Sequence, residues 1–168
     1  METSSHSASR LSTLLDVVGV LARLGLAAVW LISGYLKAVD PPGTIVAVRA
    51  YRLLPEPVVE MVAAVLPYLE IALGVLLLIG LATRLAAVLS AVVLMIFIAG
   101  VISAAARGLS IDCGCFGGGG EIAAGQTAYT AEILRDLGFL LLAGFLIFRP
   151  DTPVSIDRLV RRRTAEPA

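Results

Sequence analysis

The fold is decided by residues 58–106, which read VVEMVAAVLPYLEIALGVLLLIGLA from Val58 to Ala82, then TR, then LAAVLSAVVLMIFIAGVISAAA from Leu85 to Ala106. A helix needs about 20 apolar residues to cross the roughly 30 Å hydrocarbon core of a bilayer, and both blocks are that long. Only Thr83 and Arg84 separate them. We therefore expect two antiparallel helices packed side by side within a membrane.

Two further apolar blocks flank this pair, from Leu14 to Ala38 and from Thr130 to Phe148. The whole chain is 58% hydrophobic and only 15% charged, whereas soluble domains carry about 25% charged residues. The sequence thus predicts an all-α membrane protein, a four-transmembrane-helix bundle. Residues 1–12 are expected to form a disordered N-tail, residues 13–149 the membrane domain, and residues 150–168 a basic C-tail.

The first block is too long for a signal-peptide core of about 7–15 residues, so we expect it to be retained as a helix. The link after it, residues 39–57, is expected to hold a short interfacial helix with Thr44 as its N-cap. Aromatic residues such as Trp30 and Tyr129 are expected to form a belt near the outer membrane surface.

Orientation follows from basic residues near the span ends. Seven lie in the two tails and at Arg84, and four lie in or beside the other two links. This bias predicts cytoplasmic N- and C-termini, a multi-pass protein of the bacterial inner (plasma) membrane, and extracytoplasmic long links. Acidic and basic residues balance at 13 each, which argues against nucleic acid as a partner and leaves membrane lipid as the expected environment.

The link between the third and fourth spans holds both cysteines, in Asp112-Cys113-Gly114-Cys115-Phe116. Cysteines two residues apart close a strained disulfide that is easily reduced, and so short a loop gains little entropic stabilisation. Gly114 supplies backbone freedom for closure. We therefore predict Cys113 and Cys115 as a catalytic redox pair on the extracytoplasmic side, where disulfide chemistry persists. Asp112, Gly114 and Phe116 are expected to be supporting residues of this pair.

Other interpretations of the cysteines stay open. They could be ordinary structural thiols, or they could share a metal across a dimer, because two cysteines cannot fill a tetrahedral zinc shell alone. The one histidine, His6, lies in the N-tail, so we predict no metal site within one chain. Asp112 would raise the pKa of the Cys113 thiol and Arg107 would lower it.

Charges inside apolar spans are costly and mark functional or packing sites. Arg23 and Glu70 are both expected near mid-bilayer, where we predict a salt bridge between them. Glu132, Arg135 and Asp136 lie about one turn apart near the outer end of the fourth span. They are expected to line the entry beneath the cysteine loop, or merely to fix helix packing.

Several of these residues carry a family resemblance. The run Arg23-Leu24-Gly25, the segments 34–38 and 51–55, the segment Leu66–Glu70 with Gly74 and Gly80, and above all Cys-Gly-Cys-Phe-Gly at 113–117 resemble the DoxX-like membrane proteins, in their MauE branch. The resemblance implies a four-helix bundle, broadly similar to the core of vitamin K epoxide reductase-type enzymes. It also implies a role like that of MauE in maturing a disulfide-rich periplasmic methylamine dehydrogenase subunit beside a separate thioredoxin-like protein.

The sequence therefore predicts a membrane thiol–disulfide redox protein that exchanges electrons with a thioredoxin-like or disulfide-containing substrate protein. Either cysteine could be the attacking one. A quinone held in the bundle is a candidate electron partner, although no motif marks its site and no cofactor is certain. Two alternatives are a non-catalytic subunit that anchors a redox complex and a small transporter with Arg23 and Glu70 as its relay.

Overall fold

The structure is a computed structural model in which residues 3–159 are described, with side chains described from residue 12 onward. It is mostly helical. Three of its helices are long and apolar enough to cross a membrane: Ser12–Val39, Glu56–Ile79 and Thr83–Ala106. These lengths and compositions identify a multi-pass membrane protein.

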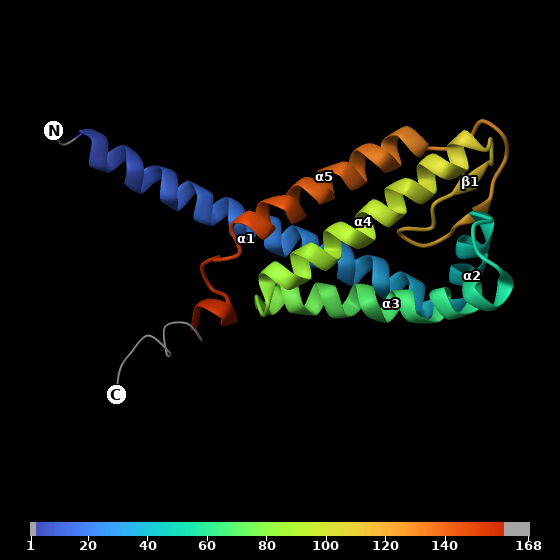
Figure 1. Ribbon diagram of the computed structural model, residues 1–168, viewed down its shortest axis with the longest axis horizontal. Coiled ribbons are helices and arrows are strands. Elements are labelled where there is room, and N and C mark those ends of the chain that lie inside the picture. The colour runs from blue at the N-terminus through green and yellow to red at the C-terminus, as the bar shows by residue number, and fades with distance from the viewer. Residues whose placement is uncertain (1–2, 160–168) are drawn as a thin grey trace.

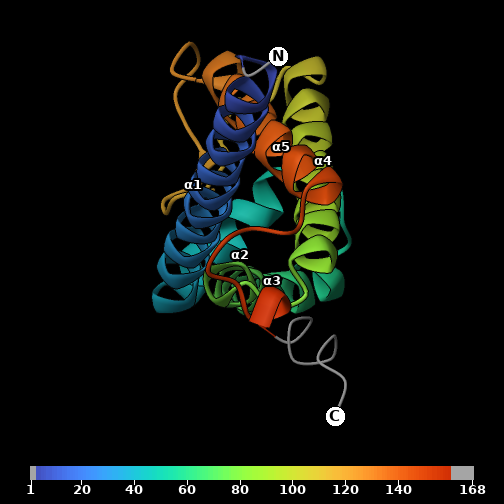
Figure 2. The same ribbon diagram turned by 90° about the vertical axis from the view of Figure 1, so that its left-hand side faces the viewer.

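Five helices and one small hairpin make up the fold (Figure 1). They are α1 (Thr3–Val39), α2 (Pro41–Ala50), α3 (Glu56–Ile79), α4 (Thr83–Ala106), β1 (Ile111–Asp112), β2 (Gly120–Glu121) and α5 (Tyr129–Phe148). Helix α1 packs mainly on α3 and α4 mainly on α5, and Figure 2 shows α1 and α4 on opposite sides of the bundle. The start of α1 and the last described residues lie at one end of the bundle, opposite the hairpin (Figure 1).

Three expected boundaries differ from the structure. Helix α1 begins at Thr3, so residues 3–12 of the segment expected to be disordered are helical, because neither proline nor glycine interrupts residues 3–18. The link between α3 and α4 is residues 80–82, because Gly80 ends α3 in the left-handed conformation with a φ of 69°. Helix α2 is capped by Asp40, whose side chain accepts a hydrogen bond from the Gly43 amide at 3.0 Å, and not by Thr44.

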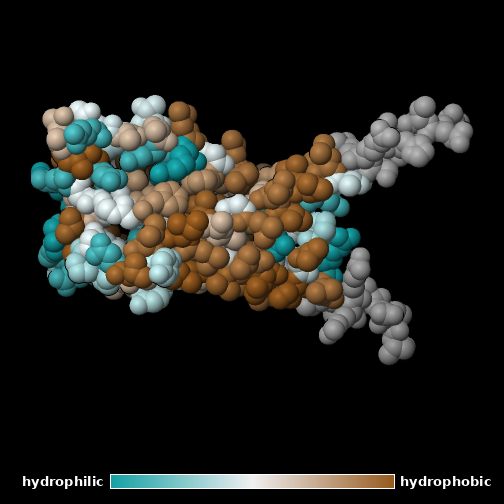
Figure 3. Space-filling model, turned by 180° about the vertical axis from the view of Figure 1, so that it is seen from behind, coloured by the Kyte–Doolittle hydropathy of each residue, from teal (hydrophilic) through white to brown (hydrophobic). Residues whose placement is uncertain are grey.

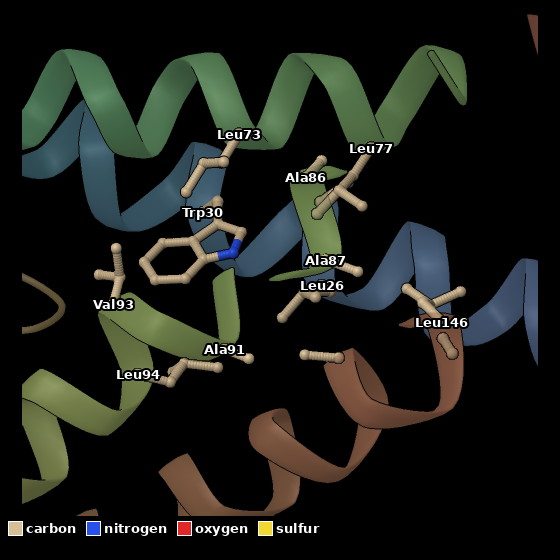
Figure 4. Packing of buried hydrophobic residues seen from close by; sticks show 13 residues of the cluster. Leu26, Trp30, Leu73, Leu77, Ala86, Ala87, Ala91, Val93, Leu94 and Leu146 are labelled. Carbon is tan, nitrogen blue, oxygen red and sulfur yellow. The ribbon is translucent and has the colours of Figure 1, made fainter. Parts of the chain in front are cut away.

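Trp30 lies at the centre of the buried core (Figure 4). Its side chain is 1% exposed, and its indole Nε1 donates a hydrogen bond to the Ser90 hydroxyl of α4 at 2.9 Å. The expected interfacial position is therefore wrong for this residue, because a buried hydroxyl on the facing helix satisfies the indole N–H. Large aliphatic side chains belong to the same buried cluster: Leu26, Leu73, Leu77, Leu94 and Leu146.

Glycine sets the distance between α1 and α3. A Cβ at Gly34 would lie 2.7 Å from the Pro67 carbonyl oxygen, and a Cβ at Gly74 would lie 2.7 Å from Leu31. Close approach of helix backbones at small residues is typical of packing in membranes, where dispersion contacts drive association.

The outer surface of the bundle is apolar along its middle and polar at the hairpin end (Figure 3). Large apolar side chains such as Leu85, Ile96 and Leu141 are 58%, 63% and 75% exposed. So wide an apolar surface would be unstable in water and suits contact with lipid. Helix α5 has 20 residues, but Glu132, Arg135 and Asp136 in its first half set it apart from the other three long helices, so a fourth membrane crossing stays a prediction.

Candidate functional site

The two cysteines lie in a loop closed by the short hairpin. Ile111 pairs with Glu121 and Asp112 pairs with Gly120 in antiparallel register, so residues 113–119 form a compact turn. Gly114 has a φ of +67°, and a Cβ there would lie 2.7 Å from the Cβ of Ala47 on α2. The loop therefore rests on α2 at a point where only glycine combines this conformation with this contact.

Both cysteines are free thiols, and the surroundings favour a thiolate at Cys113. The backbone amide of Cys115 donates to the Cys113 Sγ at 3.4 Å, and the Arg135 guanidinium lies 3.8 Å from the same sulfur. Hydrogen bonding from the Cys115 side chain, followed by that of its amide and of Arg135, lowers the pKa of the Cys113 thiol. Cys115 responds in the opposite direction, because donating to Cys113 and burial raise the pKa of its thiol well above the usual value.

Arg135 joins the cysteine loop to α5. Its Nε donates to the Asp136 carboxylate at 3.0 Å, and its guanidinium lies over the Phe116 ring at 5.0 Å from the centroid. The charges of α5 were expected either to line the space beneath the loop or to fix helix packing, and one of them, Arg135, contacts the loop. A guanidinium held both by a carboxylate and by an aromatic face presents its positive charge to the sulfur in a fixed orientation.

Two carboxylates beneath the loop have an oxygen without a hydrogen-bond partner among the described residues: Glu132 Oε2 and Asp136 Oδ2. Glu132 is 7% exposed and Asp136 3% exposed. Oxygen atoms of Asp112 and Glu132 and the Cys113 sulfur lie within 4.8 Å of one another. Three donors are one short of a closed zinc shell, and Arg135 already contacts this sulfur, so we assign no metal to the cluster and its absence stays a prediction.

A buried polar network of α1 and α3 holds the other side of the loop. The Lys37 ammonium lies 2.9 Å from Glu70 Oε1 and 2.6 Å from the Ser33 hydroxyl. It also donates to the Cys115 carbonyl oxygen at 3.1 Å, and the Ser33 Oγ lies 2.7 Å from that oxygen. Side chains of the bundle core thus bond directly to the backbone of the cysteine loop.

The predicted salt bridge between Arg23 and Glu70 is wrong, because Glu70 pairs with Lys37. Arg23 donates instead to the carbonyl oxygens of Leu77, Leu78 and Val154, each at 3.0 Å. Leu77 lies seven residues from Glu70, about 10 Å along α3 at about 1.5 Å per residue. The expectation failed because the depth of Arg23 along the bundle was counted from residue 14, whereas α1 begins at Thr3. The count therefore placed Arg23 at the wrong depth relative to Glu70.

Ser33, Lys37 and Tyr51 were not singled out as site residues from the sequence. Lys37 is the one lysine among 13 basic residues, which was the available signal. Tyr51 follows α2 and donates a hydrogen bond from its hydroxyl to the Cys113 carbonyl oxygen at 3.3 Å. Burial raises the pKa of the Tyr51 phenol well above its usual value, so the hydroxyl stays a donor.

A cavity of about 220 Å³ adjoins both cysteines between α2, α3 and α4. Its polar groups are few, and include Lys37, Tyr51 and the cysteines. The remaining wall is apolar, with Leu66 from α3 and Ile96 and Phe97 from α4. The site is therefore a dithiol between a charged, hydrogen-bonded side and a hollow with apolar walls.

Residues 15–149 match the family model described as methylamine utilisation protein MauE. This chain belongs to the MauE family. Its matched range contains α2 to α5, the cysteine loop and all but the start of α1. No curated protein and no solved structure matches the chain, and the wider DoxX-like relationship stays a prediction.

Proposed function

We propose that this MauE-family protein is a membrane thiol–disulfide exchange protein whose reactive pair is Cys113 and Cys115. The observation that carries the proposal is the asymmetry of the pair: neighbouring free thiols in one loop, with hydrogen-bond donors directed at the Cys113 sulfur. A thiolate is the attacking species in disulfide exchange. A structural pair would need no such stabilisation.

Cys113 attacks and Cys115 resolves. The Cys113 thiolate bonds to one sulfur of a partner disulfide, and the electron pair of the broken S–S bond leaves on the other sulfur. Cys115 then loses its proton and attacks the Cys113 sulfur, which releases the second partner thiol and leaves a Cys113–Cys115 disulfide. The partner's disulfide is reduced and the pair is oxidised, and the same steps run in reverse oxidise a partner dithiol.

Membership of the MauE family links the chain to redox or maturation steps related to methylamine utilisation. The proposed partner is an extracytoplasmic thioredoxin-like protein or a substrate protein with disulfides, such as a methylamine dehydrogenase subunit. The exposed ring of Phe116 and the adjacent Gly117 and Gly118 leave room for such a partner beside Cys113. A transporter is less favoured, because the relay pair it relied on, Arg23 and Glu70, is not formed.

The proposed topology has four crossings with both termini in the cytoplasm and the cysteine loop outside the inner membrane. Helix α5 is long enough for a fourth crossing, about 30 Å for its 20 residues. Its charged half faces the loop and not lipid: Glu132 and Asp136 are buried. The excess of basic residues in the tails supports this orientation.

Labelling of intact spheroplasts with a membrane-impermeant maleimide tests the proposal. After reduction, both cysteines should be labelled; after mild oxidation, labelling should be lost and should return with reductant. Labelling that requires permeabilised cells would contradict the orientation. Labelling that oxidation does not change would contradict a reversible disulfide and favour a non-catalytic anchoring subunit.

A further inference from the structure

The cavity beside the cysteines is lined in part by apolar side chains that are exposed on the outer surface of the bundle. Ile96 lines it and is 63% exposed near the middle of α4, and Leu53 and Leu54, which also line it, are 52% and 41% exposed. Each of these side chains belongs both to the cavity wall and to the apolar outer surface. An apolar molecule dissolved in the bilayer could therefore reach the thiols without crossing water.

The size and chemistry of the cavity restrict its occupant. A volume of about 220 Å³ is smaller than the roughly 300–1,000 Å³ typical of drug-sized ligand sites, so it suits a single substituted ring whose tail stays in lipid. The Phe97 ring forms part of the wall, and the Lys37 ammonium lies 5.9 Å from its centroid. A flat ring in the cavity would therefore pack against the aromatic ring of Phe97, and an oxygen on that ring would lie near the positive charge of Lys37.

The redox chemistry of the pair restricts the occupant further. Stabilising the thiolate of a reduced dithiol makes the corresponding disulfide a stronger oxidant. Such a pair oxidises partner dithiols readily, and it then needs an oxidant that accepts two electrons to form again. On the membrane side of the loop, that oxidant has to be soluble in lipid.

The geometry points to this cavity as the binding site of a lipid-soluble quinone that reoxidises Cys113 and Cys115. This inference rests on the proposed function and names its electron acceptor. The Cys113 thiolate bonds to a ring carbon, and the Cys115 sulfur then attacks the Cys113 sulfur. The S–S bond forms, the C–S bond breaks with its electron pair left on the ring, and two protons, one from Cys115 and one from solvent, complete the hydroquinone.

Lys37 is the positioning residue of this site. Lys37 lines the cavity, and its ammonium donates to the Cys115 carbonyl oxygen. The same side chain therefore lies beside the proposed position of the ring and beside the backbone of the resolving cysteine. A fixed positive charge there stabilises the oxyanion that develops on the reduced ring. Its bond to Glu70 keeps the ammonium in place within the bundle.

The test uses the full-length protein, reduced and purified in lipid nanodiscs without oxygen, with decylubiquinone as the probe. We expect one quinone to be reduced per protein while both thiols disappear. Trp at Ile96 narrows the entrance, so Ile96→Trp should slow quinone reduction by about tenfold or more. Met95→Trp is the matched control, because Met95 is a lipid-facing neighbour, 50% exposed, that does not line the cavity.

Two results would overturn the inference: no quinone reduction by wild-type protein, or equal rates for Ile96→Trp and Met95→Trp. The reaction of the same reduced protein with a soluble aromatic disulfide separates this failure from that of the proposed function. A dithiol that reduces the soluble disulfide but not the quinone contradicts the quinone site alone. A protein that leaves both unreduced contradicts the proposed function too.

Discussion

Lys37 and Cys115 are joined by a hydrogen bond of 3.1 Å from the lysine ammonium to the cysteine carbonyl oxygen. The same ammonium is bonded to Glu70 on α3, so the cysteine loop and the α1–α3 pair are one connected unit. Stability of the bundle and reactivity of the thiols should therefore change together when this network is altered.

Removing one charge of the Lys37–Glu70 pair should destabilise the protein. Lys37→Met leaves Glu70 buried without its partner, and losses from such breaks are about 3–5 kcal/mol. The double variant Lys37→Met/Glu70→Leu should regain most of this stability, because no unpaired charge remains, but its thiols should still react abnormally since Cys115 has lost a donor. Thermal unfolding and thiol alkylation in detergent measure the two effects. Normal alkylation in the double variant would contradict the link between network and loop.

Gly114→Ala should disturb the cysteine loop. Alanine at a φ of +67° is strained by about 1–2 kcal/mol, and its Cβ would also meet Ala47 at 2.7 Å. The matched control is Gly125→Ala, where φ is +87° but no atom lies within 4 Å of the added Cβ. We expect slower disulfide exchange in Gly114→Ala only, measured with a soluble disulfide. Equal losses in both variants would show that backbone strain alone accounts for the effect.

Alkylation of Cys113 should have a lower pH midpoint than that of an ordinary cysteine. The pKa of Cys113 is lowered, so its reactive thiolate is already present at a pH where an ordinary thiol, with a pKa of about 8.5, is still protonated. Cys115 should react only at higher pH, because its pKa is raised. Replacing Arg135 with Gln should shift the midpoint for Cys113 upward. Mass spectrometry of iodoacetamide-treated protein between pH 5 and pH 9 gives the midpoint for Cys113, and Cys115 should be little modified over that range; an unchanged Cys113 midpoint in Arg135→Gln would contradict the contact.

Arg23 should affect stability without affecting the thiols. Arg23→Leu leaves three carbonyl oxygens at the far end of the bundle without their donor, and hydrogen bonds to charged groups contribute about 1.5–3 kcal/mol each. We expect a clear fall in melting temperature and a normal rate of disulfide exchange. The exposed Arg84, changed to Leu, is the control and should melt close to wild type. A slowed exchange reaction in Arg23→Leu would contradict the separation of the two ends.

Local signals in the sequence were enough to predict the long helices and the presence of the cysteine loop. Apolar length gives a span directly, and the Asp40-Pro41-Pro42-Gly43 run marks a helix boundary. The family, too, could be identified from Cys-Gly-Cys-Phe-Gly in its place between two spans, and the family match confirms it.

Partners between helices could not be predicted in this way. Lys37 is long enough to reach back along α1 to Ser33 and across to Glu70, whereas counting residues from span ends selected Arg23. The inward position of Trp30 depends on Ser90, 60 residues away. Such pairs depend on helix rotation and register, which are set by packing at Gly34 and Gly74 and are not visible in one helix alone.

The most direct test of the central claim is the trapping of a mixed disulfide by each single cysteine variant. Reduced Cys115→Ser and Cys113→Ser proteins are incubated in lipid with a thioredoxin-like protein in its disulfide form and then separated on a non-reducing gel. The account predicts a reductant-sensitive adduct with Cys115→Ser, which keeps the attacking thiolate, and little or none with Cys113→Ser. An adduct with Cys113→Ser alone, equal adducts with both variants, or none with either would contradict it.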